Sequence, residues 1–478
     1  MGLLQTIGAQ DASYLPYLNT GTPYDLITGA FVPGLDNHFI LNGGLAATNG
    51  VMGRPQQFKS TFSNGLLVNA LARYPGSVFY LNDTEFALGN KRRILEMVNL
   101  HTDDPEAREK LLTELMSEDR FVITNPTEHD LESFVEKIKQ IDAYKTKHKD
   151  DFTIEIPLLD HRTGKPRRMM IPTLVSVDSL TMAPVRSALE DLENNDASSS
   201  KNNTVFMKDG NAKTKITRIL SLLSGRSGIY IMCTAHVGNK IDMTGGFAPP
   251  TKDMQYMKQG DKVKGVGSDF IALMSNLVEI RSASVLLDGD KECEYPLASG
   301  ITDPNEMSTI NTILTRCKNN NGGAQFTPVV SQSQGLQSAL TNYHYLRKHE
   351  YFGFAGNNRS HQPVLLPDVT LQRTQATKKL TDYKTSRAVE ILAQLCYVQN
   401  SWTVRDDIKQ YQMTPEQLTD GLVKRSGYAM DDILNSRGWW TYANHPRSYL
   451  SLFDILDIAS GNYKPKLHAV ILPEPKKK

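Results

Sequence analysis

The sequence predicts an α/β fold in which a mostly parallel, twisted sheet is flanked by helices. Two segments, 60–73 and 131–141, repeat apolar residues at the spacing of a helix, and short apolar runs separate such segments. The runs that suit buried strands are Val78-Phe79-Tyr80-Leu81, residues 121–124, residues 171–177 and residues 228–233. Strands that alternate with helices in this way pair in parallel and carry helices on both faces of the sheet.

Length and composition set outer bounds on the molecule. The chain has 478 residues, which is long for one simple core and suggests two or three domains. Its formal net charge is +1, so a nucleic-acid site would have to be a local patch. No run approaches the roughly 18 apolar residues of a membrane helix, and the four cysteines form no CxxC pair. We therefore expect a cytoplasmic protein without membrane contact and with reduced, structural thiols.

Three segments interrupt the alternation of strands and helices. Residues 154–171 predict a hairpin, because two strand-like stretches flank the turn Thr163-Gly164-Lys165. Residues 193–213 are polar and rich in serine and asparagine, which predicts a mobile loop. Residues 237–267 are rich in glycine, lysine and methionine without periodicity, which predicts another long loop.

A candidate phosphate-binding loop precedes the helix at residues 60–73. The run is Gly53-Arg54-Pro55-Gln56-Gln57-Phe58-Lys59-Ser60-Thr61. Backbone N–H groups and a helix N-terminus at such a turn can hold phosphates. In this interpretation Lys59 contacts the β- and γ-phosphates of ATP, and the hydroxyl of Ser60 binds Mg²⁺. Phe58 stands where the usual motif has its second glycine, so the alternative is a surface turn before a helix.

Three further strands end in polar side chains that would meet at one edge of a parallel sheet. Asp178 follows the apolar run 174–177 and either faces Mg²⁺ or simply caps a turn. Glu85 follows the next strand after the loop's helix and could deprotonate the water that attacks the γ-phosphate. His236 ends the run 229–235 and is either a sensor of the nucleotide or a hydrogen-bonded strand-end histidine. Together, these strand ends predict an ATPase.

The order of these motifs resembles that of the bacteriophage UvsX recombinases, relatives of RecA, over roughly residues 20–350. The similar stretches are the loop with an aromatic residue before Lys59-Ser60, residues 80–88 around Glu85, Val177-Asp178-Ser179-Leu180 and Thr234-Ala235-His236. The resemblance implies a RecA-type core that uses ATP and Mg²⁺ and hydrolyses ATP when it binds DNA. It also implies a head-to-tail helical filament on single-stranded DNA that promotes homologous pairing and strand exchange in recombination and repair. Recombination mediator and single-strand-binding proteins would be partners, and a phage protein would act in the host cytoplasm.

The same resemblance assigns a residue that acts between subunits. Residues 313–320 are similar to the strand that inserts basic residues into the ATP site of the neighbouring subunit. Lys318 is the basic residue that transfers to this chain. Asn320 stands where the family often has a second basic residue, for which Arg316 is a substitute.

By the same register, residues 193–213 and 237–266 correspond to the first and second DNA-binding loops. Lysines in the second loop suit DNA phosphates, and its aromatic residues suit stacking on bases. The candidates are Lys240, Phe247, Lys252, Tyr256, Lys258, Lys262 and Lys264. The alternative is a solvated loop, because lysine is common in any loop.

The predicted organisation has four parts. Residues 1–35 form an N-terminal segment that could contact another subunit, and residues 36–348 form the RecA-like ATPase core. Residues 349–375 form a linker, and residues 376–478 form a smaller, mainly helical C-terminal domain. Residues 438–442 (Gly-Trp-Trp-Thr-Tyr) belong either to a small core with buried tryptophans, which we favour, or to a winged-helix-like DNA gate.

Two other functions share parts of this pattern. A hexameric DNA helicase has the same core, but we expect a helical domain before it and an arginine rather than a lysine acting between subunits. An ATP-binding regulatory protein with little turnover does not need a general base such as Glu85. Helical filaments or closed rings on single-stranded DNA would separate the first two functions.

Overall fold

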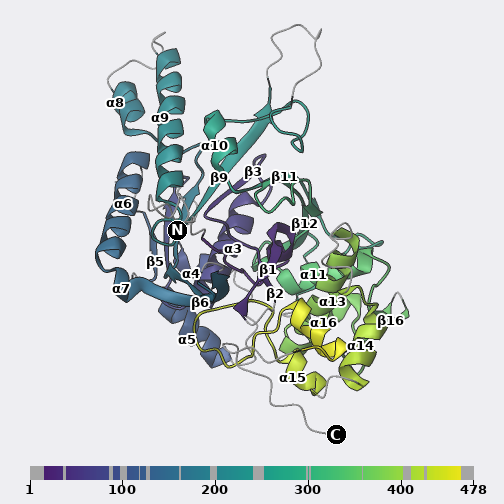
Figure 1. Ribbon diagram of the computed structural model, residues 1–478. Helices are drawn as coiled ribbons and strands as arrows, with labels where there is room; N and C mark the ends of the chain where they lie inside the picture. The colour runs from purple at the N-terminus through teal and green to yellow at the C-terminus, as the bar shows by residue number, and fades with distance from the viewer. Residues whose placement is uncertain are drawn as a thin grey trace.

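Within the described residues, eleven strands form one twisted sheet at the centre of the structure (Figure 1). The computed structural model describes residues 15–35, 39–85, 90–96, 105–117, 119–124, 130–160, 163–193, 202–240, 252–297, 300, 303–357, 359–401, 411–424 and 428–463. The strands in the order β11-β3-β9-β8-β4-β5 run parallel. Their bounds are β3 (Thr48–Gly53), β4 (Val78–Asp83), β5 (Phe121–Ile123), β8 (Thr173–Asp178), β9 (Ile229–Asn239) and β11 (Asn276–Val285).

Antiparallel strands extend the sheet beyond β11. They are β12 (Met307–Cys317), β13 (Gln325–Phe326), β14 (Val329–Ser331) and β15 (Gly335–Leu336). Because β12 runs against β11, Cys317 at its end lies beside Asn276 at the beginning of β11. The chain after β12 therefore emerges where the parallel strands begin, not where they end.

Helices lie around the sheet and beside its antiparallel edge (Figure 1). In the first part of the chain they are α2 (Tyr24–Thr28), α3 (Lys59–Arg73), α4 (Lys91–Glu96), α5 (Pro105–Leu115), α6 (Leu131–Lys147), α7 (Lys149–Phe152), α8 (Arg186–Glu193), α9 (Asn202–Leu223), α10 (Ser268–Leu273) and α11 (Ser338–Lys348). The C-terminal part contains the 3₁₀ helix η3 (Arg373–Gln375), α12 (Ala376–Lys379), α13 (Tyr383–Ser401), α14 (Pro415–Lys424), α15 (Met430–Leu434) and α16 (Leu452–Ser460).

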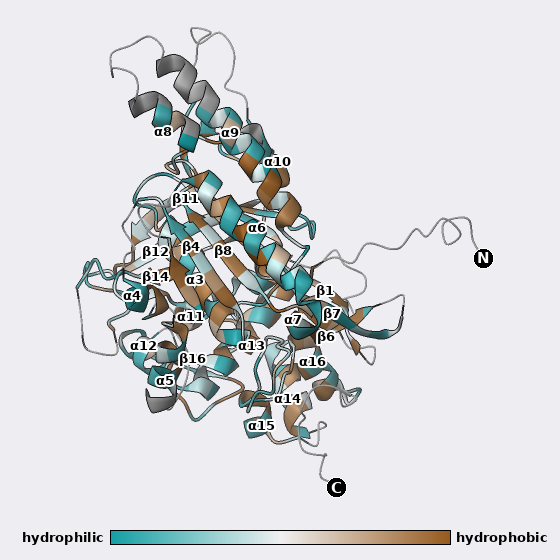
Figure 2. Ribbon diagram, turned by 90° about the vertical axis from the view of Figure 1, so that its left-hand side faces the viewer, coloured by the Kyte–Doolittle hydropathy of each residue, from teal (hydrophilic) through white to brown (hydrophobic). Residues whose placement is uncertain are grey.

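Two hydrophobic clusters, one on each face of the sheet, hold these helices. Leu174 of β8 and Met232 of β9 belong to the cluster that contains α3. Their neighbours Val175 and Ile231 belong to the other cluster, together with residues of α6 and α9. Alternate residues of a strand point to opposite faces, and the centre of the molecule is correspondingly brown in Figure 2. The predicted α/β class with a mostly parallel sheet flanked by helices is confirmed.

Three two-stranded antiparallel sheets among the described residues lie outside the main sheet. They are β1 (Ala30–Pro33) with β2 (Phe39–Asn42), β6 (Thr153–Asp160) with β7 (Lys165–Met170), and β16 (Phe354–Asn357) with β17 (Ser360–Pro363). The β6–β7 pair confirms the hairpin predicted from residues 154–171. The β16–β17 pair lies in the segment predicted as a linker, and the domain boundaries themselves remain a prediction.

Two segments predicted as loops contain regular structure. Residues 202–213 are not a loop, because they belong to α9. This helix is anchored by Ile216, Leu220 and Leu223, whose buried side chains recur at helical spacing beyond the polar stretch. Residues 237–239 continue β9, and β10 (Asp261–Val263) pairs with them antiparallel, so this segment is a hairpin at its base. Residues 194–201 and 241–251 lie outside the described part of the chain.

The C-terminal helices pack directly against the α3 side of the core. Leu66 of α3 and Leu392 of α13 belong to one continuous hydrophobic cluster. Trp440 is completely buried, and its ring lies 5.1 Å from the ring of Tyr74 just after α3. Burial of Trp440 favours the core alternative, but Trp439 is only partly buried, and Trp440 packs against the core around α3 rather than within a separate small core. None of the described helices combines the length and the apolar character needed to cross a bilayer.

Candidate functional site

The candidate phosphate loop connects β3 to α3. Gly53 ends the strand and Lys59 begins the helix, as the sequence predicts. Gln56 and Phe58 adopt left-handed φ angles of 58° and 59°. This conformation costs a residue with a β-carbon roughly 1–2 kcal/mol. The ring of Phe58 packs against the hydrophobic cluster around α3, which helps to hold a turn that usually requires glycine.

Lys59 lies inside this loop. Its side chain is buried, and its Nζ donates a hydrogen bond of 2.9 Å to the carbonyl oxygen of Arg54. Burial lowers the pKa of the Lys59 ammonium, and the nearby carboxylates of Asp178 and Glu85 partly oppose this shift. An ammonium that has lost much of its hydration interacts strongly with an incoming phosphate.

Alternation along β8 and β9 brings two of the predicted residues to the same face of the sheet. Asp178 and His236 each lie four residues beyond Leu174 and Met232, which pack against α3. Since the period of a strand is two residues, both side chains face α3 and the loop. Asp178 ends β8, whereas β9 continues beyond His236 to Asn239.

Asp178 is arranged as a metal ligand would be. Its Oδ1 accepts a hydrogen bond of 2.6 Å from the hydroxyl of Thr234, and the hydroxyl of Ser60 also bonds to this carboxyl group. Burial raises the pKa of Asp178, although these two hydroxyls oppose the shift. Its Oδ2 is buried and has no hydrogen-bond partner in the described structure. A carboxylate oxygen and a serine hydroxyl fit Mg²⁺, which typically takes few protein ligands beside substrate phosphates.

Glu85 and His236 meet directly. The Nε2 of His236 lies 3.3 Å from Oε1 of Glu85, and the hydroxyl of Ser179 donates to the same oxygen at 3.1 Å. The side chain of Glu85 remains 44% exposed, so water can reach it. The two contacts orient the carboxylate without enclosing it, which suits a group that must accept a proton from water.

Sequence reasoning missed the hydroxyl residues that connect these side chains. Thr84 accepts a hydrogen bond from the N–H of Ser179 at 2.8 Å and donates to its carbonyl oxygen at 2.9 Å. Thr234 binds Asp178, as described above. Thr84 is adjacent to Glu85, and Thr234 lies two positions before His236. A threonine or serine at the end of a strand nevertheless gives no distinctive sequence signal of its own.

The predicted sensor is joined to the hairpin that carries the candidate DNA-binding lysines. The N–H of Lys264 donates to the carbonyl oxygen of His236 at 2.8 Å. Thr181 bridges the same two residues: its hydroxyl accepts from the N–H of His236 and donates to the carbonyl oxygen of Lys264. A displacement of His236 would therefore be transmitted to the backbone at Lys264.

The candidate DNA-binding residues occupy different environments. Lys252, Lys258, Lys262 and Lys264 are exposed. Lys240 forms an ion pair with Asp253 at 2.7 Å. The ring of Tyr256 is half-buried against the turn at Gly322 and Gly323. Phe247 lies outside the described residues.

Lys318 lies at the end of the sheet where the parallel strands begin, whereas the phosphate loop lies where they finish. Its N–H bonds to the carbonyl oxygen of Ser275, where β11 begins, whereas Gly53 pairs with Ile280 four residues after Asn276. At about 3.3 Å per residue, the two edges are separated by at least about 13 Å along the strands. The structure therefore brings Lys59, Ser60, Glu85, Asp178 and His236 together in one subunit but excludes Lys318 from that group.

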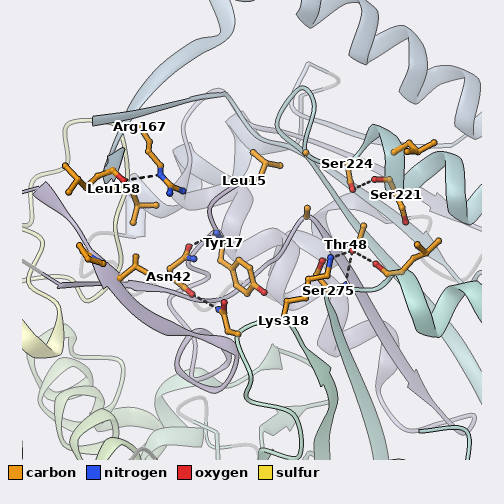
Figure 3. A pocket seen from close by; sticks show the side chains of 18 of the residues that line it. Leu15, Tyr17, Asn42, Thr48, Leu158, Arg167, Ser221, Ser224, Ser275 and Lys318 are labelled. Carbon is orange, nitrogen blue, oxygen red and sulfur yellow. Dashed lines mark hydrogen bonds between the residues drawn. The ribbon is translucent and has the colours of Figure 1, made fainter. Parts of the chain in front are cut away.

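Lys318 lines a cavity of about 1180 Å³ (Figure 3). Arg167 and Arg218 also line it, beside Tyr17 and Thr48. The rim of this cavity thus gathers three basic side chains, although Arg218 is paired with Asp269. The described lining of the cavity is otherwise mostly apolar, and Lys318 and Arg167 give it a net positive charge.

Comparison with known proteins does not identify a family for this chain. No family model matches the sequence, and no curated protein sequence matches it. Among solved structures, the crystal structure of the RadB recombinase matches 62% of this chain and 92% of its own, with 13% sequence identity. The TM-score of this match is 0.30, which carries no conclusion about family or activity. The function must therefore be inferred from the residues at the site.

Proposed function

We propose that the protein is an ATP-dependent DNA recombinase that binds single-stranded DNA as a filament and promotes homologous pairing and strand exchange. The strongest support is a group of side chains at the C-terminal ends of the parallel strands. This group consists of Lys59, Ser60, Asp178, Glu85 and His236. The hydrogen bonds from His236 to the lysine-bearing hairpin provide a reason for such a site to respond to DNA.

Each residue of the group has a distinct task in this proposal. ATP supplies the phosphoryl group, and Mg²⁺ neutralises part of its charge. Lys59 stabilises the phosphates, while Ser60 and Asp178 hold the metal. Glu85 takes a proton from the attacking water, and Ser179 and His236 hold its carboxylate in place. The backbone N–H groups of the loop and the beginning of α3 provide further donors to the phosphates.

Glu85→Gln separates nucleotide binding from hydrolysis. Glutamine keeps an oxygen that can accept from Ser179 and His236, but its amide cannot act as a base. We expect ATP to bind with nearly unchanged affinity and hydrolysis to slow on the order of 10²-fold. Single-turnover hydrolysis and binding of a fluorescent ATP analogue measure the two quantities. If binding and hydrolysis fall equally, Glu85 has a structural role and is not the base.

Exposed lysines of the hairpin are proposed to contact DNA phosphates. Alanine at Lys258, Lys262 and Lys264 together should weaken binding and flatten its salt dependence, because each lost phosphate contact removes roughly 0.7 from the log–log slope for a single strand. The control is alanine at Lys139, Lys379 and Lys424, which are exposed on helices distant in sequence. Equal slopes for the two triple variants and the wild type would place the DNA elsewhere.

Head-to-tail association is supported by the opposite positions of Lys318 and the phosphate loop. A surface at one edge of the sheet that fits a different surface at the other edge produces an open filament or a ring. Electron microscopy of the protein on single-stranded DNA with ATP distinguishes the two, and a strand-exchange assay tests the activity. Closed rings without strand exchange would favour the hexameric helicase instead.

A further inference from the structure

The side chain of Arg54, the second residue of the phosphate loop, reaches away from the loop to the base of the β9–β10 hairpin. Its Nη2 donates to Oδ1 of Asn239 at 2.7 Å and to Oδ1 of Asp261 at 3.0 Å. Asn239 and Asp261 are partners in the pairing of β9 with β10. One guanidinium nitrogen therefore contacts both strands at the last pair of the β9–β10 ladder, next to the backbone hydrogen bond from Lys240 to Gly260.

A second connection runs in parallel through Gln57. Its Oε1 accepts from the N–H of Arg54 at 2.8 Å, and its Nε2 donates to the carbonyl oxygen of Arg281 at 3.2 Å. The guanidinium of Arg281 in turn donates to the carbonyl oxygen of Tyr256, in the turn that leads to β10. Arg54 thus contacts Asp261 directly, whereas Gln57 reaches the segment 252–261 only through Arg281.

The ion pair of Arg54 is asymmetric in its exposure to solvent. The side chain of Arg54 is 43% exposed, whereas that of Asp261 is only 8% exposed. Asp261 also lies near Glu279, a carboxyl group whose pKa is raised mainly by burial, with a contribution from the charge of Asp261. Loss of Arg54 would leave a buried carboxylate beside a second acidic group, which destabilises the surrounding structure.

Bound phosphates would compete for the same guanidinium. The carbonyl oxygen of Arg54 accepts from Nζ of Lys59, so its backbone lies one hydrogen bond from the ammonium assigned to the phosphates. Arginine binds phosphate and carboxylate with similar fork-shaped geometry. A polyanionic ligand at the loop would therefore compete with Asp261 for the exposed guanidinium.

We propose that Arg54 is a positioning residue that couples nucleotide binding to the β9–β10 hairpin, because its guanidinium is exchanged between Asp261 and the nucleotide phosphates. Nucleotide binding loosens the pairing of β10 with β9 and releases the lysine-bearing segment to contact DNA. This inference rests on the proposed function for its nucleotide and DNA ligands, but the response of the hairpin to nucleotide can be measured without DNA.

Amide hydrogen exchange in residues 255–266 tests the first step. In the wild type, a non-hydrolysable ATP analogue with Mg²⁺ should accelerate exchange in this segment. In Arg54→Met, exchange should already be fast without nucleotide and should change little when the analogue is added. Asp261→Asn should behave alike, and the double variant should add no further effect, since both changes remove one interaction.

Arg186→Met is the matched control. Arg186 forms a comparable ion pair with Asp130 at 3.2 Å, with side chains that are 55% and 13% exposed, on elements away from the loop. We expect this variant to show the wild-type response. A wild-type response in Arg54→Met, or exchange that is unchanged or slower when the wild type binds nucleotide, overturns the inference.

DNA binding provides the second measurement. The analogue should tighten binding of a single-stranded oligonucleotide by a factor of about 5–150, the usual range of coupling between two sites, and DNA should tighten analogue binding by the same factor. In Arg54→Met this factor should fall toward one, while nucleotide-free DNA binding persists. A full factor in the variant overturns the coupling role.

The outcomes distinguish the two proposals. If the hairpin responds to nucleotide but no DNA binds, the inference about Arg54 stands and the recombinase function fails. If nucleotide and DNA both bind while the hairpin does not respond, the function stands and the inference fails. If the wild type binds no nucleotide, both are overturned.

Discussion

Replacement of Lys59 by alanine should abolish ATP hydrolysis and weaken nucleotide binding. The ammonium is buried, bonded to the carbonyl oxygen of Arg54 and close to Asp178 and Glu85, so its removal takes a fixed positive charge away from the phosphate loop. Preorganised positive charge at transferring phosphates is a large part of catalysis in phosphoryl transfer. Steady-state turnover and the affinity for a fluorescent ATP analogue check this expectation.

Thermal unfolding separates this loss from damage to the fold. Because burial lowers the pKa of Lys59, folding disfavours its charged form, and removal of the side chain relieves that cost. The melting temperature of Lys59→Ala should therefore not fall below that of the wild type by more than a few degrees. Lys139→Ala, an exposed lysine on α6, is the control and should keep full turnover. Unchanged turnover in Lys59→Ala would overturn the ATPase assignment.

Mixtures of Lys318→Ala and Glu85→Gln should regain ATP hydrolysis that neither variant has alone. Lys318 lies where the parallel strands begin, away from its own phosphate loop, so a role in ATP hydrolysis would require the site of another subunit. In a head-to-tail filament, a Lys318→Ala subunit with intact Glu85 sometimes receives Lys318 from a Glu85→Gln neighbour. Random association at equal concentrations creates such an interface at roughly a quarter of positions.

A second mixture provides the control for this experiment. Lys59→Ala and Glu85→Gln both disable the site within their own subunit, so mixing them should restore nothing. Turnover on single-stranded DNA is the measurement, and microscopy must show that mixed filaments form. Mixed filaments of Lys318→Ala and Glu85→Gln without recovered turnover would show that Lys318 does not act between subunits. As a dilute monomer, Lys318→Ala should still bind ATP.

The arrangement of the site follows from features that are visible in the sequence. Asp178 and His236 each end an apolar run, and parallel pairing brings the ends of such runs to one edge. Lys59 and Ser60 precede a run with helical spacing, which fixes them at a helix N-terminus. These relations are local or depend only on strand direction, so sequence reasoning can reach them.

Other parts of the site depend on tertiary contacts that carry no local signal. The left-handed conformation of Phe58 is held by packing around α3 and not by a glycine. The contact of Arg54 with Asp261 joins residues that are 207 positions apart. Residues 202–213 have the composition of a loop, but α9 is anchored by apolar residues after that stretch. Composition alone therefore indicated a lysine-rich segment, but neither its β9–β10 pairing nor the contacts that join it to the phosphate loop.

If subunits associate head to tail as proposed, the separation of Lys318 from its own phosphate loop gives the assembly two chemically different ends. At one end, the last subunit has a complete loop but receives no lysine from a neighbour. At the other end, Lys318 and its basic cavity face solvent. A stack of n subunits thus contains n − 1 complete sites, so turnover per subunit rises with length and is lowest in the shortest assemblies. Growth and shrinkage of such a polymer would then be directional, since the terminal subunit without a donated lysine would hydrolyse its nucleotide most slowly.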